Sequence, residues 1–161
     1  MENVIEQDPF KSVKVVESYD AEISAPAEKV FPLLCPVREY EWISTWTCEL
    51  VRTESGVAED MCVFITDRPP FGRETWVCTR YECPDAIQYT RFSQNAIARL
   101  DIKCIEGTAD KSTWRWTLTA VGLTDEGNRI CESATEQTLQ IFKTLNVLLE
   151  HFVTKGEMLK M

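Results

Sequence analysis

The chain has 161 residues, of which 44% are hydrophobic and 27% are charged, a composition typical of a soluble globular domain with one core. It carries 17 lysines and arginines against 26 acidic residues, a net charge of −9. Nucleic acids and anionic lipid surfaces bind clustered positive charge, so this balance argues against both as partners.

The first residues predict a short N-terminal arm, residues 1–12, followed by a single domain, residues 13–161. The arm has no apolar run as long as a signal peptide or a membrane-spanning helix, so we expect a cytoplasmic protein without membrane insertion. The seven cysteines have irregular spacing and no CxxC pair, which favours reduced core residues over a disulfide framework.

Residues 13–24 are rich in β-forming side chains with partial alternation, which predicts the first strand. Val15, Tyr19, Ala21 and Ile23 would share one face of it. A short helix should follow from Pro26, because proline favours a first helical turn and apolar residues return at helical spacing. A second short helical piece is expected at about residues 37–44.

The next segments alternate between strand-like runs and turn-forming residues. Six strands are predicted, at about residues 47–53, 61–66, 74–83, 86–93, 96–105 and 112–121. Their short connections favour antiparallel hairpins. In the last strand, Trp114, Trp116, Leu118 and Ala120 would share one face.

A helical period begins after a turn region at residues 122–128. Ser133 and Glu136 match a capping box, so we expect one long helix from about Ser133 to Lys155. Its apolar stripe comprises Leu139, Phe142, Leu145, Leu149, Phe152 and Val153. Thr135, Thr138 and Asn146 lie within this stripe, where they either meet a ligand or water in a cavity or bond to their own helix and a strand edge.

The order of these elements, together with the junction Ile23-Ser24-Ala25-Pro26-Ala27-Glu28-Lys29-Val30-Phe31, resembles the START-related (SRPBCC) superfamily of polyketide cyclases and aromatases, birch-pollen-allergen-like proteins and lipid-transfer domains. The resemblance spans about residues 13–158. It implies an α+β helix-grip fold, in which a curved seven-stranded antiparallel sheet wraps around the C-terminal helix, with two short helices after the first strand. It also implies an interior that binds an apolar or aromatic small molecule, and it transfers no catalytic residue.

The residues offer little for catalysis. His151, the sole histidine, lies away from the apolar stripe and should face solvent. The cysteines lack metal-ligand spacing, and no glycine-rich phosphate loop is present, so we expect no metal and no cofactor.

The candidate ligand-binding residues are mainly aromatic side chains, together with the polar residues of the helix stripe. They are Tyr40, Trp46, Phe64, Tyr81, Tyr89, Arg91, Trp114, Trp116, Thr135, Thr138, Phe142 and Asn146. Arg91 shares parity with Tyr89 and would enter the cavity if that face points inward, paired with a ligand carboxylate or phenolate or with Glu17. We favour the opposite register, with Phe92 inside, because arginine is rarely buried.

Three functions remain open. The leading prediction is a binding protein for a small hydrophobic or aromatic molecule. The second is a cyclase or dehydratase using Arg91, Tyr81, Tyr89 and Glu17 for proton transfer. The third is an interaction module like the chaperone activators, with an exposed apolar patch at Phe71 or at Trp42 and Trp46, and such a patch could also form a homodimer.

Overall fold

The computed structural model describes residues 9–161, and its elements follow the predicted order. The strands are β1 (Lys14–Ile23), β2 (Glu49–Arg52), β3 (Val63–Arg68), β4 (Gly72–Glu82), β5 (Ala86–Phe92), β6 (Ala96–Gly107) and β7 (Ser112–Gly122). The helices are α1 (Ala27–Val30), the 3-10 helices η1 (Phe31–Leu33) and η2 (Glu39–Glu41), and the long α2 (Asp125–Lys155).

Within residues 9–161 the strands form one seven-stranded sheet in the order β1-β7-β6-β5-β4-β3-β2. Every neighbouring pair is antiparallel. The long closing helix and the short helices after β1 complete the helix-grip arrangement, so the predicted α+β fold is confirmed.

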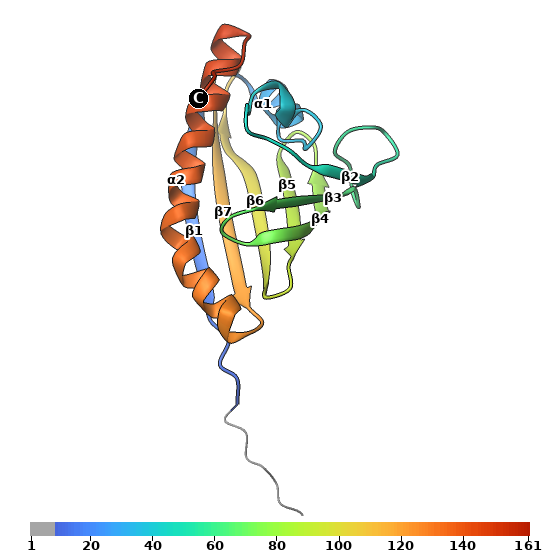
Figure 1. Cartoon of the computed structure of the whole chain (residues 1–161). Coiled ribbons are helices and arrows are strands. Elements are labelled where there is room, and N and C mark those ends of the chain that lie inside the picture. The colour runs from blue at the N-terminus through green and yellow to red at the C-terminus, as the bar shows by residue number, and fades with distance from the viewer. Residues whose placement is uncertain (1–8) are drawn as a thin grey trace, which may run out of the picture.

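Helix α2 packs mainly on β1 and β7, at one end of the strand order (Figure 1). The sheet curves away from the helix toward β4, β3 and β2, which the helix does not cover. The inner face of these strands is instead approached by the segment that carries α1, η1 and η2.

Helix α2 begins eight residues earlier than the predicted Ser133, at Asp125. Thr124 caps it, because its side chain accepts a hydrogen bond from the Gly127 N–H at 3.0 Å. Gly127 was predicted to lie in a turn, but it lies inside the first turn of α2, so that prediction was wrong. A Cβ at that position would lie 1.8 Å from the Asn95 carbonyl oxygen, so glycine is required by close packing on the loop before β6.

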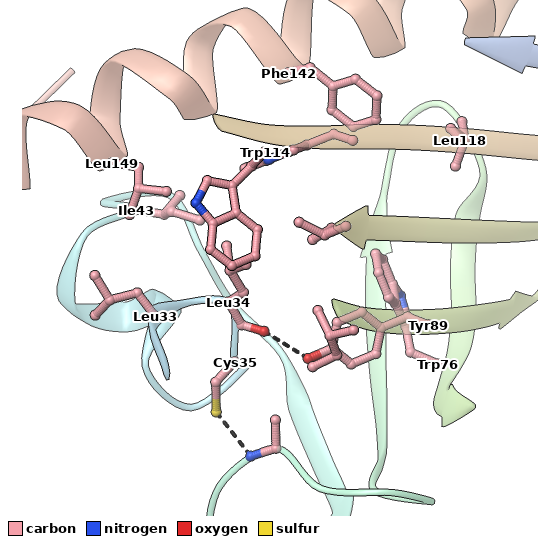
Figure 2. Close-up of a cluster of buried hydrophobic side chains, with 14 of the residues drawn as sticks. Leu33, Leu34, Cys35, Ile43, Trp76, Tyr89, Trp114, Leu118, Phe142 and Leu149 are labelled. Carbon is pink, nitrogen blue, oxygen red and sulfur yellow. Dashed lines mark hydrogen bonds between the residues drawn. The ribbon is translucent and has the colours of Figure 1, made fainter. Parts of the chain in front are cut away.

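The alternation predicted for the last strand is confirmed. Trp114, Trp116, Leu118 and Ala120 are all buried on the inner face of β7. Figure 2 shows Trp114 between α2 above and Leu34 of the short helical segment below, in a cluster of buried side chains that also includes Leu33 and Leu149. One continuous core therefore joins the sheet, α2 and the short helices.

Of the predicted arm, residues 1–8 lie outside the described residues. The remainder is held to the start of α2: the Lys11 carbonyl accepts a hydrogen bond from Asn128 Nδ2 at 2.9 Å, and Ser12 Oγ donates to the Gly122 carbonyl at 2.6 Å. The arm therefore meets the domain beside the β7–α2 junction.

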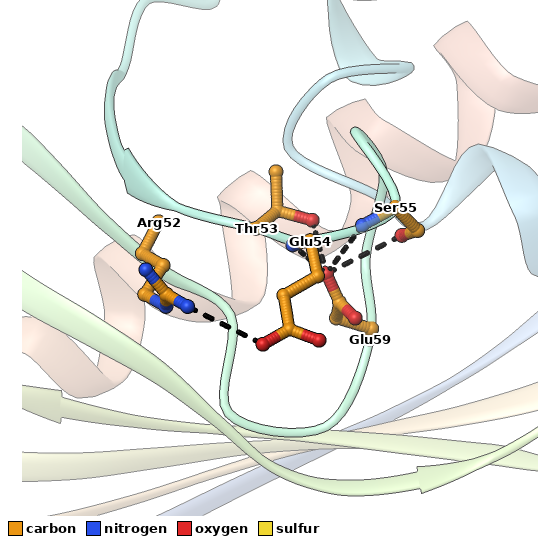
Figure 3. Close-up of polar contacts among 5 residues, drawn as sticks. All are labelled: Arg52, Thr53, Glu54, Ser55 and Glu59. Carbon is orange, nitrogen blue, oxygen red and sulfur yellow. Dashed lines mark hydrogen bonds and ion pairs between the residues drawn. The ribbon is translucent and has the colours of Figure 1, made fainter.

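Glu59 organises the loop between β2 and β3 (Figure 3). Its carboxylate accepts hydrogen bonds from the Ser55 N–H at 2.9 Å, from the Glu54 N–H and from the Thr53 hydroxyl. These bonds, that of Thr53 foremost, lower the pKa of Glu59. Arg52 pairs with Glu54 at the exposed side of the same loop.

All seven cysteines carry free thiols, but not all are core residues as predicted. Cys35, Cys62, Cys78 and Cys131 are buried, whereas Cys83 is exposed at the β4–β5 turn. No helix in residues 9–161 is both long enough and apolar enough to cross a membrane.

Candidate functional site

A cavity of about 410 Å³ lies between the inner face of the sheet, the middle of α2 and the segment around η2. This volume falls within the range of small-molecule sites in proteins. Strands β3 to β7 supply the largest share of its lining residues, α2 supplies residues between Thr138 and Leu148, and the β3–β4 turn with Pro69, Pro70 and Phe71 forms one side.

The sheet side of the cavity is an aromatic cluster. Phe64 on β3 and Trp76 on β4 are register partners, and their rings stack with centroids 5.1 Å apart. Tyr89 on β5 meets both rings edge-on, at 5.6 Å from Phe64 and 5.9 Å from Trp76. Trp46 completes the cluster at 6.3 Å from Phe64. These four rings give the sheet side of the cavity a largely aromatic surface.

The helix side of the cavity is formed by Phe142 and its neighbours on α2. Phe142 packs edge-on against Trp116 of β7, with ring centroids 5.6 Å apart. Figure 2 places Phe142 on the helix across the core from Trp76 and Tyr89. Thr138, only 5% exposed, lies one turn earlier on the same helix and also lines the cavity.

Arg91 points into the cavity, contrary to the register favoured by the sequence analysis. Its Nη2 donates to Glu74 Oε1 at 2.6 Å and its Nε donates to Glu74 Oε2 at 3.1 Å. The guanidinium also lies 3.9 Å over the Trp76 ring. Glu74 neutralises the buried charge, instead of Glu17 or a ligand anion, the partners considered from the sequence, and Phe92 is exposed.

Two further charged residues line the cavity, Glu39 from η2 and Arg68 from the end of β3. Burial raises the pKa of Glu39 to about 8, although the positive charge of Arg68 acts to lower it. The Arg68 guanidinium lies 5.3 Å over the Trp46 ring and donates to the Thr45 carbonyl. Burial also raises the pKa of Tyr89, whose hydroxyl donates to the Leu34 carbonyl at 2.8 Å.

One buried donor of the cavity wall has no partner. Trp116 is 2% exposed, and its indole Nε1–H makes no hydrogen bond to residues 9–161. By contrast, Trp76 Nε1 donates to Thr66 at 2.7 Å and Trp46 Nε1 donates to the Pro36 carbonyl at 2.8 Å. A buried N–H without a partner is costly, so this position favours an acceptor nearby.

The structure brings seven of the twelve predicted site residues together around the cavity. They are Trp46, Phe64, Tyr89, Arg91, Trp116, Thr138 and Phe142. The other five, Tyr40, Tyr81, Trp114, Thr135 and Asn146, do not line it.

Local packing explains where these five lie. Trp114 shares a face with Trp116 but is covered by Phe31, and its Nε1 donates to Ser112 at 2.8 Å. Tyr81, 38% exposed, packs edge-on against Phe31 from outside the cavity. The Tyr40 hydroxyl accepts a hydrogen bond from the Cys48 N–H at 2.9 Å.

Thr135 and Asn146, the two helix residues outside the cavity, form hydrogen bonds to their own helix and to the edge strand, which was one of the two alternatives considered from the sequence. Thr135 donates to the Cys131 carbonyl at 3.4 Å, within its own helix. Asn146 donates from Nδ2 to the Tyr19 hydroxyl on β1 at 3.1 Å, because this side of α2 rests on the sheet edge. Its Oδ1 is buried without a partner among the described residues.

Sequence reasoning missed Glu39, Arg68, Phe71 and Trp76 as cavity residues. Trp76 had a usable signal, since it shares one face of β4 with Glu74 and Cys78, and the residues between them lie on the other face. Glu39 and Arg68 had none, because one sits in a single 3-10 turn and the other at a strand end. His151 is half-buried rather than exposed and does not line the cavity, and residues 9–161 contain no group of three potential ligands placed to hold a metal ion.

No protein-family model matches the sequence, and no curated protein matches it. Solved structures do match. A norcoclaurine synthase from Thalictrum flavum in complex with dopamine and hydroxybenzaldehyde aligns with a TM-score of 0.60 and 11% identity, covering 87% of this chain and 89% of that one.

Two other solved structures agree. A START superfamily protein from Mycobacterium smegmatis aligns with a TM-score of 0.63 and 15% identity, over 85% of this chain and 98% of that one. A protein from Rhizobium loti aligns with a TM-score of 0.62 and 10% identity, over 87% of this chain and all of that one (100%). At these identities the likeness concerns the fold, and the chain therefore has the START-like helix-grip fold.

Proposed function

We propose that this protein binds a small hydrophobic or aromatic molecule in the cavity between the sheet and α2. The observation that carries the proposal is the cavity itself, about 410 Å³, with aromatic walls on both sides. In a cavity of this size lined by Phe64, Trp76 and Trp116, replacing water with the apolar surface of a ligand lowers the free energy, and this favours binding. The norcoclaurine synthase of the same fold, in complex with two small aromatic molecules, supports an aromatic ligand by analogy.

The test is to fill the cavity and measure affinity for naphthylethanol by isothermal titration calorimetry. Thr138→Phe places a ring in the cavity from the middle of α2, and we expect it to weaken binding at least about tenfold. Gln137→Phe adds the same ring one residue earlier on the exposed side of the helix and should leave the affinity unchanged. Circular dichroism confirms that both variants fold. Equal affinity of Thr138→Phe and the unaltered protein would refute binding at this site.

The arrangement favours binding over the cyclase or dehydratase alternative. Of the four groups named for proton transfer, only Arg91 and Tyr89 line the cavity, and Tyr81 and Glu17 do not. The Arg91 guanidinium is engaged by Glu74, and the Tyr89 hydroxyl is engaged by the Leu34 carbonyl. Neither is poised to exchange a proton with a substrate, because both already hold strong partners and burial raises the pKa of Tyr89.

The interaction-module alternative required an exposed apolar patch at Phe71 or at Trp42 and Trp46, and these side chains are buried. Phe71, Trp42 and Trp46 are 6%, 0% and 9% exposed, so they form core and cavity wall instead of an exposed apolar surface.

A further inference from the structure

Glu39 and Arg68 are the charged residues of the cavity that Glu74 does not neutralise. Within residues 9–161, Glu39 makes no side-chain hydrogen bond, and Arg68 makes no ion pair within 4.0 Å. Both line the cavity beside Thr45 and Trp46. Arg68 donates to the Thr45 carbonyl, and the Ile43 N–H donates to the Glu39 carbonyl, so both groups meet the cavity at the segment formed by residues 39–46.

The surroundings of Glu39 favour its protonated form near neutral pH. The titratable groups that face it are Arg68 from β3, Tyr89 from β5 and Cys48 from the segment after η2. Helix α2 contributes only uncharged residues to the cavity, Gln140 and Thr144 among them. Burial outweighs the single positive neighbour, so the carboxyl is mostly a neutral acid that can donate a hydrogen bond.

Three of the groups that line the cavity can donate hydrogen bonds to a ligand. Arg68 uses an N–H toward the Thr45 carbonyl and keeps others free, since a guanidinium carries five. The protonated Glu39 offers an O–H, and Trp116 offers its unpartnered indole N–H. With Arg68 charged and Glu39 neutral, this side of the cavity carries a net positive charge.

We infer, on the basis of the proposed function, that the cavity prefers hydrophobic molecules carrying a carboxylate, with the carboxylate between Glu39 and Arg68 and the apolar body between Phe64 and Phe142. A carboxylate is an acceptor with two oxygens, which matches a guanidinium fork and an adjacent acid O–H. A neutral alcohol would leave the arginine charge without a counter-ion. An ammonium group would be repelled by the Arg68 charge and would find hydrogen-bond donors where it needs acceptors.

Three ligands with the same ring system separate the head group from the body: naphthylacetic acid, naphthylethanol and naphthylethylamine. We expect the acid to bind at least about tenfold more tightly than the alcohol at pH 7, and the amine to bind most weakly. Equal affinity of acid and alcohol, or tighter binding of the amine, overturns the head-group inference and leaves the proposed function standing. Absence of binding by all three overturns both.

The same inference predicts how affinity depends on pH. Ionisation of Glu39 places a negative charge beside the bound carboxylate, so the affinity for naphthylacetic acid should be constant from about pH 6 to 7 and fall above about pH 8, by up to about tenfold per pH unit. The affinity for naphthylethanol should be far less dependent on pH. A flat profile for the acid from pH 6 to 9 contradicts the inference.

Two substitutions assign the residues. Glu39→Gln keeps a hydrogen-bond donor and cannot ionise, so it should retain acid binding and abolish the loss above pH 8. Arg68→Gln should reduce the preference for acid over alcohol at least about fivefold. The matched controls are Glu41→Gln on the same 3-10 helix and Arg52→Gln on the exposed β2, each of which should behave as the unaltered protein. Loss of acid preference in a control equal to that in Arg68→Gln would contradict the assignment.

Discussion

Arg91, which lines the cavity, and Glu74 form a two-point ion pair with N–O distances of 2.6 and 3.1 Å. The pair is buried: the side chain of Glu74 is 3% exposed and that of Arg91 is 14% exposed. Each charge is tolerated there only because the other is present, and Trp76 lies against the guanidinium at 3.9 Å. This part of the cavity wall therefore depends on a polar contact beside the aromatic cluster.

Removing Glu74 should leave Arg91 as an unpaired buried charge. We predict that Glu74→Ala lowers the free energy of unfolding by about 3–5 kcal/mol, measured by urea denaturation. Glu82→Ala, on the same strand but in the exposed pair with Arg80, should cost less than about 1 kcal/mol. Similar losses in the two variants would contradict the account of the pair.

A substitution at Gly127 tests whether close packing on Asn95 requires a glycine at this position of α2. In an unpacked helix, glycine to alanine is stabilising by about 1 kcal/mol. Here the new Cβ would lie 1.8 Å from the Asn95 carbonyl oxygen, so we predict that Gly127→Ala destabilises the protein in thermal unfolding. A higher melting temperature would show that the helix does not approach Asn95 this closely.

The start of α2 can be tested separately. Thr124→Ala removes the side-chain cap and should cost about 1 kcal/mol in urea unfolding. Ser133→Ala changes an exposed residue inside the helix and should cost less than about 0.5 kcal/mol. The reverse order would support a helix that begins at the capping box predicted from the sequence.

Glu39 should make stability depend on pH. Its pKa is about 8 in the folded chain against an ordinary value of 4.5, so between these values the folded protein binds more protons than the unfolded one. Stability should therefore fall as pH rises from about 4.5 to 8, by up to about 1.4 kcal/mol per pH unit, with no further contribution above or below that window. The measurement is the unfolding free energy of the unaltered protein minus that of Glu39→Gln across pH 4 to 9. A difference that does not change with pH would contradict the raised pKa of Glu39, and Glu41→Gln serves as the control.

The sequence predicted most of the fold because its signals are local. Alternation in β7 placed Trp114, Trp116, Leu118 and Ala120 on one face, and the structure confirms it. The predicted start of α2 was wrong because glycine occurs in two different settings. It favours turns, but Gly127 lies inside the helix and allows close packing on Asn95.

The candidate site could be predicted only in part. Periodicity placed Trp116, Thr138 and Phe142 on inner faces, but it could not tell which end of the sheet is covered by Phe31 and which stays open. The register of Arg91 was misjudged because its partner Glu74 lies 17 residues away on the neighbouring strand, and pairing across strands is a tertiary contact. Glu39 was not predicted as a cavity residue for the same reason, since its neighbours in the cavity come from other elements.

The most direct test of cavity binding is a titration with naphthylethanol followed by nuclear magnetic resonance of isoleucine, leucine and valine methyl groups. We predict saturable shifts at Ile102, Leu118 and Leu148, which line the cavity, and unchanged signals at Ile23 and Val30, which are buried elsewhere in the core. Shifts confined to methyl groups outside the cavity, or none at saturating ligand, would contradict the account.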